Sequence, residues 1–242
     1  MSSRVLITGG GSGTGADMAR SFAAQGHEVV ITGRSMDKLQ EVAGDGIRAV
    51  QGDVTEPDQL RTIFEAAGPC QIVIANAGVA EAAPFQKVTA DHWHRMITTN
   101  LTGVFLTFQH GLAQMSEGGR LIAISSIAGI RGAAYAAPYA ASKHGVMGLV
   151  RSLALEVARK GITVNAICPG YLDTEMTQRT LSNITEKTGR SRDEALASLT
   201  AKNPQGRLVA PAEVTATALW LASAGAASVN GQAILLDGGE SA

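Results

Sequence analysis

The chain has 242 residues, with 20 Lys+Arg against 21 Asp+Glu, which gives a formal net charge of −1. This near-neutral balance argues against a nucleic-acid surface and against a charge-held membrane anchor. Hydrophobic residues make up 45% of the chain and charged residues 17%, which predicts a folded domain with a sizeable core. Only two cysteines, no secretory leader and no apolar stretch of membrane length together predict a cytoplasmic protein without disulfides.

Short β-branched runs alternate with longer amphipathic stretches along the chain. The predicted strands cover residues 5–8, 28–32, 48–51, 72–75, 121–125, 163–167 and 233–236. The predicted helices cover residues 13–26, 36–42, 58–66, 101–114 and 138–160, the last capped by Gly161. This alternation predicts βαβ units. We therefore expect one α/β domain over residues 1–242, a doubly wound Rossmann fold whose seven-stranded parallel sheet has helices on both faces.

Residues 175–208 interrupt the alternation with polar helical pattern and no strand. Gly189 is expected to end a first helix, and Ser191 with Glu194 forms a capping box for a second. The segment predicts a small helical lid over a substrate, with simple surface decoration as the alternative.

A glycine-rich turn, Thr-Gly-Gly-Gly-Ser-Gly-Thr-Gly at residues 8–15, follows the first predicted strand and opens the first predicted helix. Glycines let the backbone approach a pyrophosphate, and a helix N-terminus offers it free N–H groups. A flexible turn without ligand is the alternative, but the strand–turn–helix context favours a dinucleotide site.

The end of the second predicted strand bears on the choice of cofactor. Gly33 stands where an acidic residue would bind the ribose hydroxyl, and Arg34 follows it. A guanidinium suits a 2′-phosphate through charge-assisted hydrogen bonds. We therefore predict NADP(H), with NAD(H) as the open alternative and Arg34 then merely solvated.

Tyr139 and Lys143 lie four residues apart in the long predicted helix, so both side chains share one face. A nearby ammonium favours the phenolate and lowers the pKa of a tyrosine, which would suit the pair to acid/base work. Ser126 closes the fifth predicted strand, at the edge where open α/β sheets bind ligands. A turn or capping serine is the alternative for Ser126.

Six motifs occur in one order along the chain. They are Thr8-Gly-x-x-x-Gly-x-Gly15, Asn76-Ala77-Gly78, Asn100, Ser126, Tyr139-x-x-x-Lys143 and Pro169-Gly170. In this order and spacing they resemble the compact short-chain dehydrogenases/reductases, and the resemblance spans residues 5–239. It implies an oxidoreductase that transfers a hydride between NADP(H) and a ketone or secondary alcohol, without a metal.

The resemblance also implies roles for individual residues. Tyr139 would be the general acid/base and Ser126 would hydrogen-bond the substrate oxygen. Lys143 would hold the nicotinamide ribose and lower the pKa of the phenol, and Asn100 would bind a water that relays protons to Lys143. The implied cofactor-binding residues, besides Arg34, Tyr139 and Lys143, are Gly9, Gly13, Thr14, Gly15, Asp53, Val54, Asn76, Gly78, Pro169, Gly170 and Thr174. A purely structural role is the alternative for Asn76 and Asn100.

The wall between Ser126 and Tyr139 is mostly small and apolar, with Arg131 as its one charged residue. Such a wall suits an uncharged or acyl-chain carbonyl. Residues 137–146 resemble bacterial acyl-thioester and polyketide ketoreductases, although Val79-Ala80-Glu81 replaces the Pro-Gly-Gly common in the latter. We expect a 3-oxoacyl thioester of coenzyme A or acyl carrier protein, or a related ketone.

Cations in the predicted lid could meet the phosphates of such a carrier, or could simply form a solvated face. They are Arg179, Lys187, Arg190, Arg192, Lys202 and Arg207. Other readings are an NAD-dependent secondary-alcohol or 3-hydroxyacyl dehydrogenase, an extended-type epimerase or dehydratase, and a non-catalytic cofactor-binding protein. Small residues around Ala140, Gly145 and Gly148 predict close helix packing in a homotetramer or homodimer.

Overall fold

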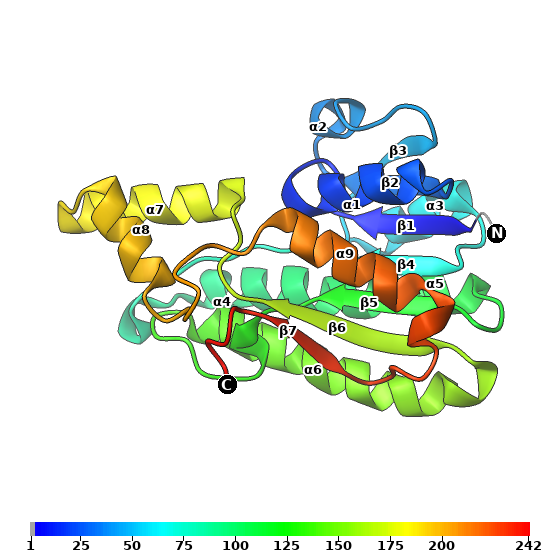
Figure 1. Ribbon diagram of the computed structural model, residues 1–242. Coiled ribbons are helices and arrows are strands. Elements are labelled where there is room, and N and C mark those ends of the chain that lie inside the picture. The colour runs from blue at the N-terminus through cyan, green and yellow to red at the C-terminus, as the bar shows by residue number, and fades with distance from the viewer. Residues whose placement is uncertain (1–2) are drawn as a thin grey trace.

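A computed structural model describes residues 3–242, and its centre is one parallel sheet (Figure 1). The strand order is β3-β2-β1-β4-β5-β6-β7. The strands are β1 (Arg4–Thr8), β2 (Glu28–Gly33), β3 (Ile47–Gln51), β4 (Ile72–Ala75), β5 (Arg120–Ile124), β6 (Thr163–Pro169) and β7 (Ala233–Leu236). The predicted seven-stranded parallel sheet is confirmed, and each predicted strand end lies within two residues of the observed one.

Helices cover both faces of the sheet (Figure 1). One face packs against α1 (Gly13–Ala24), α2 (Met36–Gln40) and α9 (Pro211–Ala222). The other packs against α3 (Pro57–Ala67), α5 (Gly103–Gln114) and α6 (Ala137–Val157). Two apolar cores therefore lie between the sheet and its helix layers, as in other doubly wound folds.

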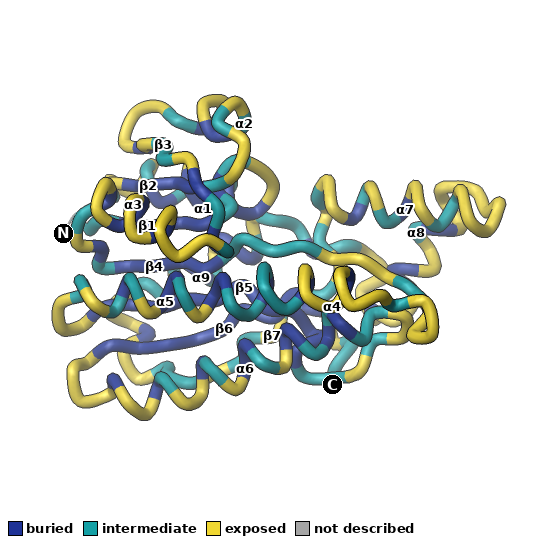
Figure 2. Tube along the Cα trace, turned by 180° about the vertical axis from the view of Figure 1, so that it is seen from behind, coloured by how far each residue is buried: buried dark blue, intermediate teal, exposed yellow. Residues whose placement is uncertain are grey.

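The central strands are apolar on both sides because both faces are covered. Every residue of β4, β5 and β6 is buried, and Figure 2 shows this continuous burial through the middle of the fold. Uninterrupted apolar runs are typical of such doubly covered parallel strands. The sheet therefore forms a fixed frame from which the loops at its carboxyl edge extend.

The chain before α5 differs from the prediction. A helix was expected to start at residue 101, but α4 (Ala90–Ile97) comes first and runs through a π-helical turn, η2 (Thr98–Thr102), into α5. Thr89 caps α4 by accepting a hydrogen bond from the amide of His92 at 3.1 Å. Such π-helical turns occur frequently at functional sites, and this one contains Asn100.

Short helical turns complete the layers. They are η1 (Phe85–Lys87), η3 (Ile127–Gly129), η4 (Ala158–Lys160) and η5 (Ala224–Ala226). The predicted end of the long helix is confirmed, since α6 passes into η4 and stops at Gly161, which has a left-handed φ of 67°. No helix within residues 3–242 combines the length and the apolar character needed to cross a bilayer.

Two further helices, α7 (Glu175–Thr188) and α8 (Arg192–Thr200), extend past the carboxyl ends of the strands (Figure 1). The predicted boundary between them is confirmed, because Gly189 is left-handed. The capping box is confirmed too: Ser191 Oγ accepts from the amide of Glu194 at 3.2 Å, and Glu194 Oε2 accepts from the amide of Ser191 at 2.8 Å. These helices share a small apolar cluster of their own, formed by Leu181, Ala195 and Leu199.

Candidate active site

The candidate residues meet at the carboxyl edge of the sheet. β1 pairs with both β2 and β4, so successive connections leave in opposite directions at this point. Ligands of open α/β sheets bind in the crevice that such a reversal opens. The glycine turn follows β1, Ser126 follows β5 and Gly170 follows β6, so parallel strand direction brings all three to one edge.

The glycine turn is closed so tightly that side chains are excluded. A Cβ on Gly15 would lie 2.2 Å from the carbonyl oxygen of Gly9, which itself has a left-handed φ of 66°. Asn76 Nδ2 donates to the carbonyl oxygens of Thr8 at 2.9 Å and Gly9 at 3.2 Å. The amide of Asn76 thus holds the turn in shape, and its side-chain donors already have protein partners.

The N-terminus of α1 is free to receive an anion. Ser12 occupies the N-cap position without a side-chain hydrogen bond to the helix, and the first turn of α1 has no acidic residue. Uncapped first-turn N–H groups and the helix dipole favour a phosphate here. Together with the tight glycine turn, this end of α1 fits the pyrophosphate of a dinucleotide.

Arg34 is exposed beyond the end of β2. Its carbonyl oxygen accepts from Gln51 Nε2 at 2.7 Å, which fixes the backbone, while its guanidinium has no hydrogen bond or ion pair within residues 3–242. Asp53 instead orders its own loop, because Oδ1 accepts from the amide and the hydroxyl of Thr55, both at 2.9 Å. Val54 is buried in the core under α3 and α5.

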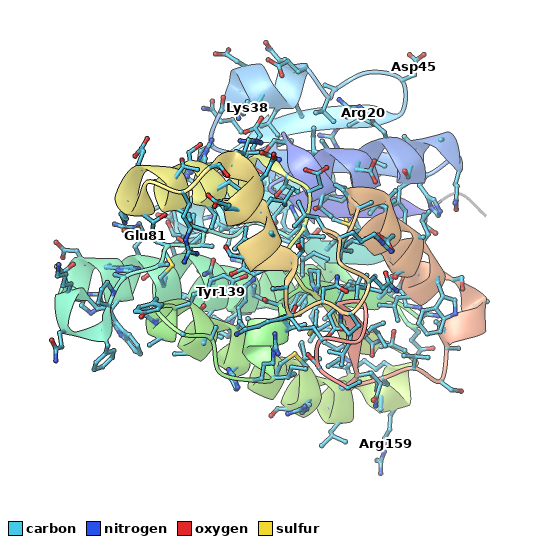
Figure 3. All side chains as sticks on the ribbon, turned by 60° about the vertical axis from the view of Figure 1, so that its left-hand side comes forward. Arg20, Lys38, Asp45, Glu81, Tyr139 and Arg159 are labelled. Atoms are coloured by element: carbon cyan, nitrogen blue, oxygen red, sulfur yellow. The ribbon has the colours of Figure 1, made fainter. Side chains whose placement is uncertain are left out.

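A second cation, which the sequence analysis missed, lies beside the glycine turn. Lys38, labelled in Figure 3, lies on α2 and forms an ion pair of 3.1 Å with Glu175, the first residue of α7. The two residues border a cavity of about 210 Å³ against Gly11, Ser12 and Gly13. Since 137 positions separate them in the chain, no local pattern could have found the pair.

Ser126, Tyr139 and Lys143 come together as the sequence analysis expected. Ser126 caps η3, with Oγ accepting from the amide of Ala128 at 3.1 Å, and its hydroxyl is near enough to the phenol of Tyr139 to lower the pKa of that phenol. Tyr139 lies on the first turn of α6 (Figure 3). One turn later, Lys143 places Nζ 5.7 Å from the ring centroid of Tyr139 and donates to the carbonyl oxygen of Ile124 at 2.8 Å.

The pKa of Tyr139 differs from the expectation. Burial raises the pKa of the phenol above its ordinary value, and the hydrogen bond from Ser126 only partly opposes this. The expected lowering by Lys143 is therefore wrong, because burial dominates and Lys143 is not among the groups that lower this pKa. Burial also lowers the pKa of Lys143 to about 8. At neutral pH the phenol is protonated and can donate its proton.

Asn100 is held by backbone rather than turned to the solvent. Its Oδ1 accepts from the amide of Val79 at 2.8 Å, and its Nδ2 donates to the carbonyl oxygen of Val79 at 2.9 Å. A Cβ on Gly78 would lie 3.2 Å from Asn100 Oδ1 and 3.8 Å from Lys143 Nζ. The π-helical turn therefore fixes the loop after β4 against Lys143.

The segment after β6 closes the other side of the edge. Pro169 ends β6, and the amide of Gly170 donates to the carbonyl oxygen of Leu236 at 2.9 Å. Thr174 is the N-cap residue of α7 and makes no capping hydrogen bond. A Cβ on Gly13 would lie 3.6 Å from Thr174 Cγ2, so the start of α7 lies beside the glycine turn and its threonine hydroxyl is available.

Comparison with known proteins gives the family. The family model described as enoyl-(acyl carrier protein) reductase matches residues 9–241. The putative ketoacyl reductase 1 of the granaticin polyketide synthase from Streptomyces violaceoruber is 37% identical over 97% of this chain and 91% of the relative. The chain belongs to the short-chain dehydrogenase/reductase family. As a member of this family, it is an oxidoreductase, as predicted.

Other short-chain dehydrogenases/reductases show the same likeness. The 3-oxoacyl-(acyl-carrier-protein) reductase MabA of Mycobacterium tuberculosis is 37% identical, over 99% of this chain and 93% of the relative. A variant of actinorhodin polyketide ketoreductase, solved with NADPH, has a TM-score of 0.91 and 34% identity, over 99% of this chain and 97% of that one. Levodione reductase has a TM-score of 0.91 and 31% identity, over 98% of this chain and 97% of that one. The predicted Rossmann fold is confirmed.

Proposed function

We propose that the protein is an NADPH-dependent ketoreductase that reduces a 3-oxoacyl thioester, carried by coenzyme A or acyl carrier protein, or a related uncharged ketone. The observation that carries this proposal is the grouping of Ser126, Tyr139 and Lys143 beside the glycine turn. The names of the ketoacyl and 3-oxoacyl reductase relatives support the substrate class.

The unpaired guanidinium of Arg34 supports NADPH over NADH. An exposed cation at the end of β2 suits the 2′-phosphate, and no acidic side chain follows β2 directly to repel it. The related ketoreductase structure that contains NADPH points the same way. Bound there, NADPH would supply the hydride, with the glycine turn and α1 holding its pyrophosphate and Thr174 its carboxamide.

The protein's own residues would supply the proton that the ketone oxygen receives. Tyr139 donates its phenolic proton to the oxygen of the ketone, and Ser126 donates a hydrogen bond to the same oxygen as negative charge develops. The ammonium of Lys143 stabilises the phenolate that remains until solvent returns a proton. The raised pKa of Tyr139 favours this direction, because the phenol starts out protonated.

The helices of residues 175–208 would cover the substrate. Their cluster of Leu181, Ala195 and Leu199 is separate from the two main cores, so they can move as one unit. The ion pair between Lys38 and Glu175 would link this lid to the glycine turn, where the cofactor would bind. Of the lid cations, Arg179 and Arg207 pair with acids of the same chain, which leaves fewer charges for a carrier phosphate.

Self-association in a homodimer or homotetramer is part of the proposal. Phe105 on α5 is 42% exposed and Leu155 on α6 is 82% exposed, while Trp220 on α9 and Leu235 on β7 are 45% and 40% exposed. β7 is moreover an edge strand of the sheet, with one side unpaired within the described chain. Two apolar surfaces, one on α5–α6 and one on α9–β7, would thus be covered by further copies.

We also propose a cytoplasmic location, because both cysteine thiols of the chain are free. Cys70 and Cys168 are both free and buried. Burial raises the pKa of the Cys70 thiol to about 11, which makes it unreactive. A chain that depends on no disulfide suits a reducing compartment.

The direct test is loss of nicotinamide absorbance with acetoacetyl-CoA, using NADPH and NADH in parallel. Turnover that prefers NADPH is the expected result. Turnover with NADH alone would overturn the assignment of Arg34. Failure to reduce any thioester or neutral ketone, despite tight NADPH binding, would overturn the substrate class while the family stands.

A further inference from the structure

An ion pair lies beside the proposed substrate site and joins the C-terminal tail to the substrate wall. Arg131 Nη2 bonds the carboxylate of Glu240, and Nη1 donates to the carbonyl oxygen of Glu240 at 3.2 Å. The side chain of Arg131 is 34% exposed, whereas that of Glu240 is only 4% exposed. The carboxylate is thus enclosed, and the guanidinium is open on one side.

The pair lies close to the proton donor. Arg131 is five positions after Ser126, and its amide donates to the carbonyl oxygen of Ile127 at 3.1 Å. A Cβ on Gly170 would lie 3.7 Å from Glu240 Oε2, so the carboxylate also borders the loop after β6. Ser126, which precedes the wall, and Tyr171, which follows Gly170, both act on the phenol of Tyr139.

Tyr171 connects the pair with Tyr139 electrostatically. Burial raises the pKa of Tyr171, the charge of Glu240 raises it further and that of Arg131 lowers it. The pKa of Tyr139 is raised chiefly by burial, and the charge of Tyr171 raises it further. Arg131 and Glu240 thus act on Tyr171, and Tyr171 acts on Tyr139.

The charge balance of the wall decides which substrates suit it. Arg131 is the one charged residue between Ser126 and Tyr139, and a free guanidinium there would bind a substrate carboxylate in a charge-assisted pair. The carboxylate of Glu240 already forms that charge-assisted pair with Arg131. A substrate anion would have to displace a buried carboxylate and leave it without its cation, which is costly.

We propose that Glu240 determines substrate charge: by neutralising Arg131 it makes the site select uncharged ketones over 3-oxo acid anions. This inference rests on the proposed ketone reduction and specifies its substrate class. Glu240 is a positioning residue, since it acts through Arg131.

The test compares two ligands that share one ketone, ethyl acetoacetate and acetoacetate. Binding is measured by calorimetry on the complex with NADP⁺, in which no hydride is available and neither ligand reacts. The wild-type protein should bind the ester at least about tenfold more tightly, the size expected for one charge-assisted pairing. Glu240→Gln should bind acetoacetate about tenfold more tightly than wild type, with ester affinity within about twofold.

Two further variants separate charge selection from tail anchoring. Arg131→Met/Glu240→Gln should lose the gain in acetoacetate affinity, because the freed cation is gone. Glu28→Gln breaks the exposed pair with Arg4 at the opposite edge of the sheet, removes the same net charge and should change neither affinity. With NADPH, Glu240→Gln should raise kcat/KM for acetoacetate chiefly through KM.

The inference is overturned if wild type binds both ligands equally well, a result that needs no variant to fold. It is also overturned if Glu240→Gln leaves the ratio of affinities within twofold, or weakens both ligands in parallel as loss of tail anchoring would. Failure of every variant to reduce the ester would count against the proposed function instead, because the binding ratio is measured without turnover.

Discussion

Lys143 donates a 2.8 Å hydrogen bond to the carbonyl oxygen of Ile124, so α6 and β5 are joined through the ammonium next to Tyr139. The side chain is 5% exposed, and burial lowers its pKa to about 8. This bond joins α6 to the sheet, and it links the charge of Lys143 to the stability of the fold.

We predict a pH-dependent contribution of Lys143 to stability. Between pH 8 and about 10.5 the unfolded chain holds the proton that the folded chain has released, so the free energy of unfolding should rise with pH. The slope is at most about 1.4 kcal/mol per pH unit. Urea unfolding of wild type and Lys143→Met at pH 7.5 and 9.5 checks this, because the difference between them cancels the titration of other groups. A difference that stays constant or falls with pH contradicts it.

Tyr139→Phe should abolish turnover while it leaves cofactor binding in place. Removal of a general acid costs about a hundredfold or more in kcat. Tyr135→Phe is the matched control: Tyr135 lies in the loop before α6, is 68% exposed, and its variant should retain kcat within about twofold. Steady-state kinetics and NADPH fluorescence titration measure the two effects. Unchanged kcat in Tyr139→Phe would refute its role as proton donor.

Arg34→Ala should weaken NADPH specifically. Loss of a charge-assisted contact to the 2′-phosphate is expected to raise the Kd for NADPH about tenfold or more, and the Kd for NADH should change little. Arg159→Ala, at the far end of α6 (Figure 3), removes the same charge as a control. An equal loss of affinity for NADPH and NADH would show that Arg34 does not bind the 2′-phosphate.

Gly15→Ala should disrupt the glycine turn. Its new Cβ would meet the carbonyl oxygen of Gly9 at 2.2 Å, and relief of this overlap by backbone movement should cost about 1–3 kcal/mol of stability and weaken NADPH binding. Gly44→Ala has no atom within 4 Å of the added Cβ and should be neutral or slightly stabilising. Denaturant unfolding of both variants gives the comparison, and a Gly15→Ala protein as stable as wild type would contradict the close approach.

Leu155→Asp should dissociate the proposed assembly. The side chain is 82% exposed on α6, so a charge there costs little in a monomer but would be buried without a partner between two copies. Sedimentation velocity should give a dimer or tetramer for wild type and smaller species for the variant. Gln109→Asp on α5 offers a second position on the same surface. A monomeric wild-type protein would refute self-association.

Local patterns in the sequence were sufficient for the elements and for much of the site. Apolar runs separated by amphipathic stretches determine the strands of a covered parallel sheet, and a spacing of four on one helix places Tyr139 beside Lys143. Gly161 and Gly189 mark helix ends because few other residues adopt a left-handed φ. These properties depend on neighbours within a few residues, so sequence alone determines them.

Tertiary structure decided the charges and pKa values around that site. The pair of Arg131 with Glu240 joins positions 109 apart, and no periodicity in the sequence predicts a partner so far along the chain. The same holds for Asn100, whose amide the fold pairs with Val79. Whether a neighbouring ammonium or loss of water dominates the pKa of Tyr139 depends on how completely packing excludes solvent, and packing is a property of the whole fold.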